Sequence, residues 1–479
     1  MISTTDQTEL IPRVDARDDA SDVLAGLREK LSPRGDVVSP RGRELTARVF
    51  GEPLAPSAVV DRICRDVRES GTAAVLRYNQ ALDGVELTGE TLRVPADDLA
   101  KAHAAIDPAL LDSIRRIRDR VARFQEGIRH RDVTVSGGPG VLTQKRLSSI
   151  AGASLDSAGS SSPGVTMTQR YLPLRRVGIC VPGGAAAYPS TVLMTVVPAQ
   201  VAGVDEIAVV APPTRFGAYN EVMLATCHEL GVREVYRVGG AQAVAALAYG
   251  CDAIPAVDKI VGPGNLFVAL AKKLVYGVVD IDSFAGPSEV IVIADDTARP
   301  DYIAADLLSQ AEHSPGSAIL ISWSATLLDR VAAELARQVA ELERGELTRD
   351  SLREFGALIR VRDEAQACEL TDRFAPEHLH IQTADPRALI GRIRNSGAAF
   401  LGPYTPVALG DYAAGPSHVL PTGGTCTWAS GLSCNSFLRS GSVTEFDALG
   451  LSQIAADVER LAAQEGLTAH ARSVSIRHG

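Results

Sequence analysis

The stretch VGICVPGG (177–184) places a short apolar run shortly before STVLMTVVPAQVAG (190–203), an apolar segment of helical length. The same pairing of a short run with a longer stretch recurs downstream in 206–231, 234–250 and 257–277. A strand followed by a helix, repeated in this way, predicts βαβ units that share a parallel sheet.

A second series of this kind begins at EVIVIAD (289–295) and ends at GAAFLG (397–402). It contains the amphipathic stretch PDYIAADLLSQAEH (300–313) and the apolar run EHLHIQ (377–382). Two series of alternating strands and helices predict an α/β fold with two doubly wound domains.

The residues before these series differ in pattern. Residues 1 to about 50 are polar and interrupted by proline, whereas helical periodicity dominates from about 55 to 130. DVTVSGGPGVLTQKR (132–146) predicts two short strands around a turn. AGASLDSAGSSSPG (151–164) has no apolar period, so we expect a flexible loop there.

The composition argues against several classes of protein. The chain has 479 residues, 46% of them hydrophobic, and a formal net charge of −10 without a basic cluster, which argues against nucleic-acid binding. Its seven cysteines form no CxxC pair, so we expect reduced thiols in a cytoplasmic protein. The sequence contains no run of 18 apolar residues, so we expect no membrane span.

Gln310 and His313 stand three residues apart at the end of the amphipathic stretch 300–313. Residues at this spacing share a helix face, with about 5–6 Å between their Cβ atoms, which suits two ligands of one metal ion. A histidine in the last turn of a helix also caps free carbonyl groups and complements the helix dipole. The spacing alone favours the capping role.

Glu377 and His378 form an adjacent carboxylate and imidazole, a natural acid/base pair. Neighbours on a strand point to opposite faces, so both can line one pocket only at a strand end or on a turn. Pro376 makes a strand start plausible at this point. The alternative is an exposed strand end with ordinary polar residues.

Asp411 and His418 lie in ALGDYAAGPSHVLPTGG (408–424), which is rich in glycine and proline. Long loops of this composition often carry function, and the alternative is a plain surface loop. His470, near the C-terminus, has no distinguishing context of its own.

Two glycine-bearing turns follow predicted strands, in VGGAQ (238–242) and VGPGNLF (261–267). A helix that starts after such a turn can bind phosphate through its free N–H groups. The second turn lacks the third glycine of the dinucleotide fingerprint, so both are equally well explained as tight βα turns.

Taken together, these segments resemble the histidinol dehydrogenase family, and the resemblance covers nearly the whole chain after about residue 55. It rests chiefly on IDSFAGPSE (281–289), SQAEH (309–313), APEHLHIQ (375–382), LGDYAAG (409–415) and LTAH (467–470). The combination of the first two motifs in this order is highly specific.

The resemblance implies two incomplete Rossmann-like domains with small N- and C-terminal extensions. We expect an N-terminal arm at 1–55, a discontinuous first α/β domain at 56–179 and 288–432, a second Rossmann-like domain at 180–287, and a C-terminal extension at 433–479.

The resemblance also implies a zinc site. Its expected ligands are Gln310, His313, Asp411 and His470. Imidazole nitrogen and carboxylate oxygen are common zinc ligands, and a weak amide ligand leaves the metal able to accept the substrate's imidazole and amine. In this family the C-terminal histidine comes from the partner subunit, which implies a homodimer with a shared active site.

The implied reaction converts L-histidinol to L-histidine through an aldehyde, with reduction of two NAD. His378 is expected to take the alcohol proton and Glu377 to activate the water that adds to the aldehyde. Zinc would position the substrate, while NAD carries the redox chemistry. The expected substrate contacts are Ser288, Gln310, His313, His378, Asp411, Glu465 and His470.

The expected NAD positions are Cys180, Gln242 and Asn265. A tyrosine usually occupies the first of these positions in the family, and a thiol cannot stack on a ring as tyrosine does. Ser417 stands where the family commonly has asparagine, the loop at 151–164 resembles an insertion, and the N-terminal arm is longer than expected.

Two other functions compete with the dehydrogenase. A zinc hydrolase would use the same metal site, with Glu377 activating water. A catalytically impaired homologue would keep only a binding role. The second βα domain argues against the hydrolase, and the intact Glu377–His378 pair argues against the impaired homologue.

Overall fold

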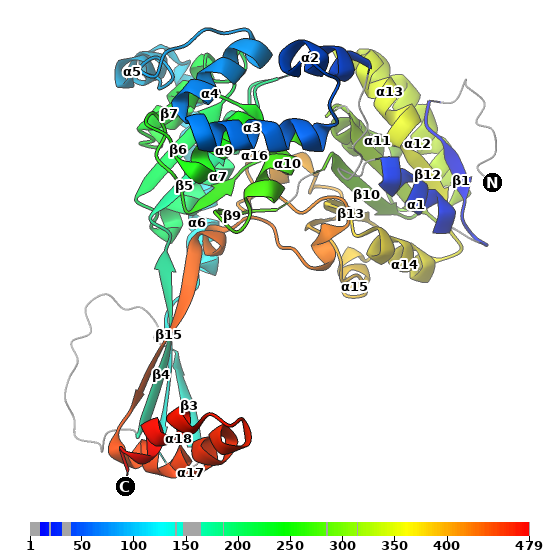
Figure 1. Cartoon of the computed structure of the whole chain (residues 1–479). Coiled ribbons are helices and arrows are strands. Elements are labelled where there is room, and N and C mark those ends of the chain that lie inside the picture. The colour runs from blue at the N-terminus through cyan, green and yellow to red at the C-terminus, as the bar shows by residue number, and fades with distance from the viewer. Residues whose placement is uncertain are drawn as a thin grey trace. The chain divides into compact units, whose positions relative to one another are not determined.

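The computed structural model describes residues 10–18, 21–30, 40–138, 141–146, 164–184, 186–283, 286–313 and 315–478. The expected loop at 151–164 falls outside these residues except for its last position. The chain forms two compact units, which are Met1–Gly127 with Arg175–Cys434 and Ile128–Leu174 with Asn435–Gly479 (Figure 1).

A five-stranded parallel sheet in the first unit is formed by the first predicted βα series. Its strands, in the order β7-β6-β5-β8-β9, are β7 (Glu234–Arg237), β6 (Glu206–Ala211), β5 (Arg176–Cys180), β8 (Lys259–Val261) and β9 (Asp280–Ile281). The helices that follow the strands are α7 (Pro189–Ala202), α8 (Glu221–Glu229), α9 (Gly240–Tyr249) and α10 (Leu266–Val275). Every residue of β5 is buried, as expected for a strand covered on both faces.

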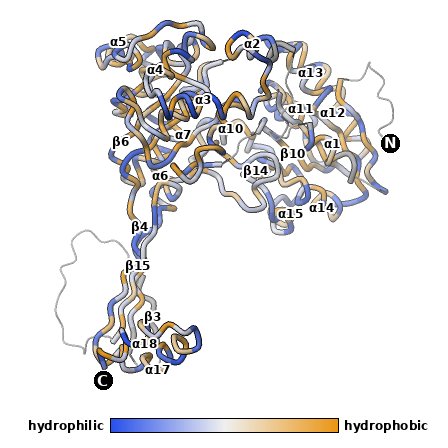
Figure 2. The backbone as a smooth tube through the Cα atoms, viewed as in Figure 1, coloured by the Kyte–Doolittle hydropathy of each residue, from blue (hydrophilic) through white to orange (hydrophobic). Residues whose placement is uncertain are grey.

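A helical layer packs on α9 and α10 of this sheet. It consists of α2 (Pro40–Phe50), α3 (Pro56–Ser70), α4 (Thr72–Tyr78) and the π-helical turn η1 (Asn79–Asp83), whereas α5 (Ala96–Ala105) and α6 (Pro108–Ile128) pack at α8. Hydrophobic and hydrophilic residues intermingle along α3, and its apolar face packs on α9 and α10 (Figure 2). This packing brings the helical layer to the side of the sheet where α9 and α10 begin.

A six-stranded parallel sheet in the same unit is formed mainly by the second predicted series, which confirms the α/β class. Its strands, in order, are β1 (Arg13–Asp15), β12 (Ala357–Arg360), β11 (Gly316–Ser322), β10 (Ser288–Ala294), β13 (His378–Gln382) and β14 (Ala398–Leu401). The central strand β10 alternates between two cores, because Val290 and Val292 belong to one and Ile291 and Ile293 to the other.

Helices cover both faces of this sheet. One face carries α11 (Pro300–Ala311), α12 (Ala325–Gln338), η2 (Val339–Glu341) and α13 (Gly345–Phe355), and the other carries α1 (Ser21–Lys30), α14 (Glu364–Phe374) and α15 (Pro386–Ile390) (Figure 1). The segment after β14 contains α16 (Ala408–Tyr412), η3 (Thr425–Thr427) and η4 (Cys434–Phe437).

The second unit contains a four-stranded antiparallel sheet. Its strands, in the order β15-β4-β2-β3, are β15 (Leu438–Phe446), β4 (Val165–Pro173), β2 (Val133–Gly138) and β3 (Val141–Arg146), and its helices are α17 (Ala448–Gln464) and α18 (Thr468–Ser475). The two strands predicted within 132–146 are therefore confirmed as β2 and β3. Within the part of the chain that the structure describes, no helix has the length and hydropathy needed to cross a membrane.

Candidate active site

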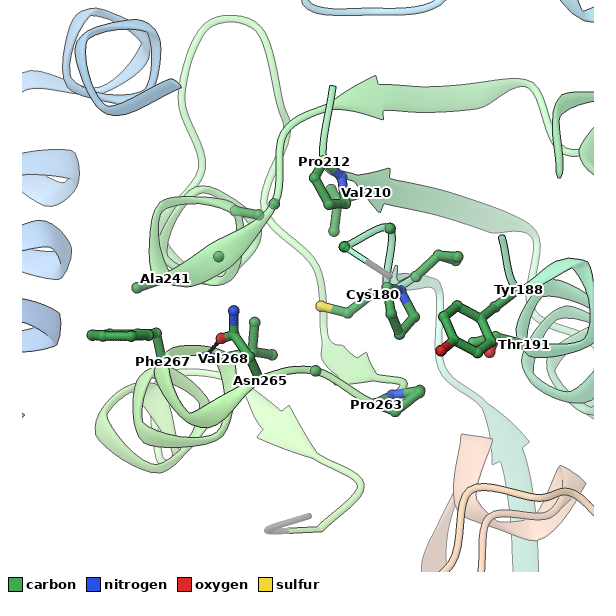
Figure 3. A pocket seen from close by; sticks show the side chains of 18 of the residues that line it. Cys180, Tyr188, Thr191, Val210, Pro212, Ala241, Pro263, Asn265, Phe267 and Val268 are labelled. Carbon is green, nitrogen blue, oxygen red and sulfur yellow. Dashed lines mark hydrogen bonds between the residues drawn. The ribbon is translucent and has the colours of Figure 1, made fainter. Parts of the chain in front are cut away.

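A cavity of about 700 Å³ lies in the first unit at the carboxyl ends of the five-stranded sheet. Residues that end or follow four of its strands line the cavity, namely Cys180, Pro212, Gly239 and Pro263. Figure 3 labels three of them, Cys180, Pro212 and Pro263. Ligands of open α/β sheets bind in this position. Residues of the six-stranded sheet and its connections line the remaining wall, including Ser288, His313, Glu377, His378 and Asp411.

The glycine turns at this cavity are required by close backbone packing. Gly262 has a φ of +104°, and a Cβ there would lie 2.2 Å from the carbonyl oxygen of Cys180. Asn265 begins α10 as its N-cap, and its Oδ1 accepts a hydrogen bond from the N–H of Val268 at 3.2 Å. Gln242 lies in the first turn of α9 and is buried. The starts of both helices therefore lie at the wall of the cavity.

Cys180 ends β5 and lies between the two sides of the cavity. Figure 3 shows Ala241 and Phe267 on one side of it, and Tyr188 and Thr191 on the other. Burial raises the pKa of the Cys180 thiol to about 11, so at neutral pH it is a neutral, small apolar group. It contributes volume to the cavity but no charge.

Glu377 and His378 stand at the start of β13, and both line the cavity. The left-handed conformation of Ala375, with φ +49°, ends α14 and turns the chain through Pro376 into this position. The strand-start geometry, which the sequence left open, therefore accounts for two adjacent residues at one cavity.

Backbone and side-chain contacts fix both members of this pair. Glu377 Oε2 accepts hydrogen bonds from Ser288 Oγ at 2.6 Å and from the N–H of Glu289 at 3.0 Å. His378 Nδ1 lies 3.2 Å from the carbonyl oxygen of Glu289. Because a carbonyl only accepts, Nδ1 carries the proton and Nε2 of the neutral ring is left with a free lone pair.

Burial sets the charges of the pair. It raises the pKa of Glu377 to about 7, although the hydrogen bonds from Ser288 and Glu289 oppose this shift. Burial also lowers the pKa of His378 below its usual value. The histidine is therefore a neutral base at neutral pH, and the glutamate exchanges its proton in the physiological range.

The two candidate ligands from the SQAEH motif occupy the end of α11. Gln310 lies in its last turn, is buried, and has an amide nitrogen with no hydrogen-bond partner among the described residues. His313 lies two residues beyond the helix and lines the cavity. Burial lowers the pKa of His313, which keeps the ring neutral and able to bind a metal.

Asp411 in α16 lines the same cavity as His313. Burial raises its pKa to about 6, and the neighbouring Glu377 raises it further, whereas His378 lowers it. Such a carboxylate lacks a cation. His418 Nδ1 donates to the carbonyl oxygen of Asp411 at 2.9 Å, which ties the 408–424 segment together.

The two C-terminal candidates lie in the second unit. Glu465 follows α17 and His470 lies in α18; both are exposed, and neither lines the cavity. Among the described residues of the single chain, no three His, Cys, Asp or Glu side chains cluster as a metal site. The first unit by itself brings together His313 and Asp411, with Gln310 on the adjoining helix turn.

Sequence reasoning missed Glu289 as a member of the site. Its main chain contacts both Glu377 and His378, while its own carboxylate is buried beside Arg28 of α1 at 3.5 Å. Its position directly after Ser288 in AGPSE was the available signal. His418 and Asp83 also line the cavity, and neither was predicted to do so.

Comparison with known proteins gives consistent matches along the chain. The sequence model of the family described as histidinol dehydrogenase matches residues 54–478. A histidinol dehydrogenase of Rhodopirellula baltica is 67% identical over 471 residues, which are 98% of this chain and 97% of the relative. One of Moorella thermoacetica is 46% identical, over 91% of this chain and 98% of the relative. The solved histidinol dehydrogenase of Elizabethkingia anophelis matches with a TM-score of 0.82 at 28% identity, over 98% of each chain.

Proposed function

The chain belongs to the histidinol dehydrogenase family, and from this premise we propose that it oxidises L-histidinol to L-histidine, through L-histidinaldehyde, with reduction of two NAD. One observation carries the proposal. The buried pair Glu377–His378 lines the same cavity as the candidate metal ligands His313 and Asp411 and the glycine turns that begin α9 and α10.

The residues present fit a zinc ion. Asp411 is a half-buried carboxylate whose raised pKa reflects the absence of a cation among the described residues, and His313 lines the same cavity as a neutral imidazole. Gln310 would bind through its amide oxygen, which turns the amide N–H2 group away from the metal. We propose that these three hold Zn²⁺ together with the partner subunit's His470. Bound zinc would supply a Lewis acid that fixes the imidazole and amine of the substrate.

The residues at the glycine turns fit a dinucleotide. We propose that Gln242 and Asn265 hold NAD at the starts of α9 and α10, with Cys180 beneath it. Bound NAD would supply the hydride acceptor for each of the two oxidations.

The acid/base steps fall to the two residues at the start of β13. His378 Nε2 accepts the hydroxyl proton of the alcohol, because its Nδ1 is held as a donor to Glu289. Glu377 then removes a proton from the water that adds to the aldehyde, while the protonated His378 returns its proton to the aldehyde oxygen. The neutral His378 accepts the hydroxyl proton of the hydrate in the second oxidation. Ser288, which donates to Glu377, would hand its hydrogen bond over to the substrate as Glu377 takes up its proton.

The proposal includes a homodimer in the cytoplasm. The exposed side chains of Glu465 and His470, in the C-terminal extension (433–479), would complete the site of the partner subunit. The proposal keeps the expected N-terminal arm (1–55), first domain (56–179 with 288–432) and second domain (180–287). Seven free cysteines suit a reducing compartment.

The test is NADH formation, followed by absorbance, with histidinol, NAD and Zn²⁺, and with two NADH expected for each histidine formed. Glu377→Gln and His378→Ala are expected to slow histidine formation by about 10²–10⁴-fold without loss of the fold, as checked by circular dichroism. Hydrolysis of a histidine ester or amide without NADH formation would instead establish the zinc hydrolase. Binding of histidinol without any turnover would establish an impaired homologue.

A further inference from the structure

A carboxylate that the proposed chemistry does not use lines the cavity. Asp83 ends the π-helical turn η1, in the helical layer, and is half-buried. The cavity residues of the same layer are largely apolar, and include Phe50, Ile63 and Leu82. A carboxylate among apolar side chains is costly unless donors satisfy it.

The protein itself satisfies Asp83 poorly. Within the described residues, its hydrogen bonding amounts to one long contact from Gln242 Nε2, at 3.5 Å to Oδ2. Burial raises the pKa of Asp83 to about 6, and no cation among the described residues offsets that shift. Gln242 Oε1 is itself buried without a partner. Among the described residues, this end of the cavity therefore holds one acceptor with a single long contact, Asp83, and one without a donor, Gln242 Oε1.

Asp83 marks the end of the cavity that lies away from the proposed metal ligands. Asp83 contacts Gln242, which directly follows Ala241 in the chain. Figure 3 shows Ala241 on the opposite side of Cys180 from Tyr188. Tyr188 directly precedes α7, and α7 packs against α16, the helix that contains Asp411. The starts of α9 and α10 lie on the Ala241 side of the cavity as well.

These positions orient the dinucleotide. The nicotinamide has to lie near His378, so the adenosine extends past the helix starts, which suit its pyrophosphate. It ends among the apolar residues around Asp83, where a flat base can pack and a ribose can present two hydroxyl groups. A carboxylate can accept both hydroxyl hydrogens of a vicinal diol.

We propose that Asp83 accepts hydrogen bonds from the 2′- and 3′-hydroxyl groups of the adenosine ribose of NAD, and so selects NAD against NADP. This inference rests on the proposed function, because it takes NAD as the oxidant. A 2′-phosphate would replace one donor by a dianion beside a carboxylate, which is repulsive. None of the described residues that line the cavity is a lysine or arginine, so nothing in it would pair with that phosphate.

Equilibrium binding of nucleotide fragments tests the inference apart from turnover. We would measure 5′-AMP and 2′-deoxy-5′-AMP by calorimetry on the full-length protein, since the two differ only in the 2′-hydroxyl group. The wild type is expected to bind 5′-AMP about tenfold more tightly, the scale of one hydrogen bond to a charged group. Asp83→Ala and Asp83→Asn are expected to bind the two fragments within about twofold of each other.

Turnover gives a second readout. Asp83→Ala is expected to raise KM for NAD about tenfold with kcat at saturating NAD nearly unchanged, and to narrow the preference for NAD over NADP. Asp97→Asn, at an exposed aspartate in the first turn of α5, is the matched control. It should leave the affinities for both fragments and the KM values for NAD and NADP unchanged.

The outcomes separate the inference from the proposed function. If the wild type oxidises histidinol with NAD but binds 5′-AMP and 2′-deoxy-5′-AMP equally, or if Asp83→Ala keeps the wild-type discrimination, the role of Asp83 is wrong and the activity stands. If the wild type neither binds 5′-AMP nor forms NADH with histidinol, the proposed function is wrong and the role of Asp83 is wrong with it.

Discussion

Asp306 Oδ2 lies 2.9 Å from Nδ1 of His380, and this buried pair joins α11 to β13. On α11, Asp306 shares a face with Gln310, one turn further on, and on β13, His380 shares a face with His378. The other ring nitrogen, His380 Nε2, donates to the carbonyl oxygen of Gly402 at 3.0 Å. The pair thus holds the helix that carries the proposed metal ligands against the strand that carries the base.

Asp306→Ala is expected to destabilise the protein by roughly 3–5 kcal/mol, because it leaves a buried imidazole without its carboxylate. It is also expected to weaken zinc binding at least tenfold, since the helix of Gln310 loses its anchor. Urea unfolding and competition with a chelator measure the two effects. Glu346→Ala, at an exposed pair with Arg349, should change stability by less than about 0.5 kcal/mol. Unaltered zinc affinity in the Asp306 variant would contradict the anchoring role.

The pKa of Glu377, near 7, predicts a pH dependence for the aldehyde-to-acid half of the reaction. Glu377 acts as a base only when ionised, so this half is expected to lose rate as the pH falls through about 7. Single-turnover assays with histidinaldehyde across roughly pH 5.5–9 measure this dependence. In Glu377→Gln the remaining slow rate should lack this limb, whereas Glu369→Gln on the exposed face of α14 should retain it. A limb that survives in Glu377→Gln would assign the titration to another group.

Glu377 is also expected to lower the free energy of unfolding at alkaline pH. Its folded-state pKa is raised from 4.5 to about 7, so between these values the folded chain retains a proton that the unfolded chain has lost. Stability therefore falls as the pH rises through this window, and the cost is complete above about 7. Glu377→Gln is expected to increase the free energy of unfolding at pH 8 by roughly 1–3 kcal/mol, with no gain near pH 4. Urea unfolding of both proteins at pH 8 and near pH 4 measures this change. An equal change in the free energy of unfolding at both pH values would refute the linkage.

The sequence predicted the parts of this molecule that depend on local pattern. The alternation of short apolar runs with helical stretches predicted both parallel sheets, because buried strands and the helices that cover them each have a characteristic pattern of apolar residues. The three-residue spacing of Gln310 and His313 likewise placed both at one helix end.

The parts that pattern did not reveal are contacts between distant residues. Asp306 and His380 are 74 positions apart (380 − 306), and no local pattern pairs them. Asp83 meets Gln242 only because α3 packs on α9 and α10, which brings the helical layer to the cavity. Glu289 acts through its main chain, which no residue-type argument can detect.

Removal of a proposed metal ligand provides a direct test of the zinc site. His313→Ala is expected to lose zinc and activity, since the remaining donors cannot replace the imidazole that lines the cavity. Elemental analysis of the purified protein gives the metal content, and dialysis of the wild type against a chelator should abolish NADH formation until zinc is restored. His228→Ala, at a histidine in the last turn of α8 and not among the cavity residues, is the matched control. Full zinc occupancy in His313→Ala would remove this residue from the ligand set.

Cys180→Tyr tests how the family's usual aromatic residue acts at the centre of the cavity. Cys180 lines the cavity, so a larger side chain at this position can extend into it beside the proposed nicotinamide dinucleotide site. We expect KM for NAD to fall severalfold, because a stacked ring adds about 0.5–1.5 kcal/mol beyond its buried area. Cys180→Ser is the control, and should leave KM for NAD nearly unchanged, because burial already keeps the thiol neutral. An unchanged KM in Cys180→Tyr would mean that another cavity residue already supplies the missing contact, and Phe267, on the Ala241 side, would be the first to replace by alanine.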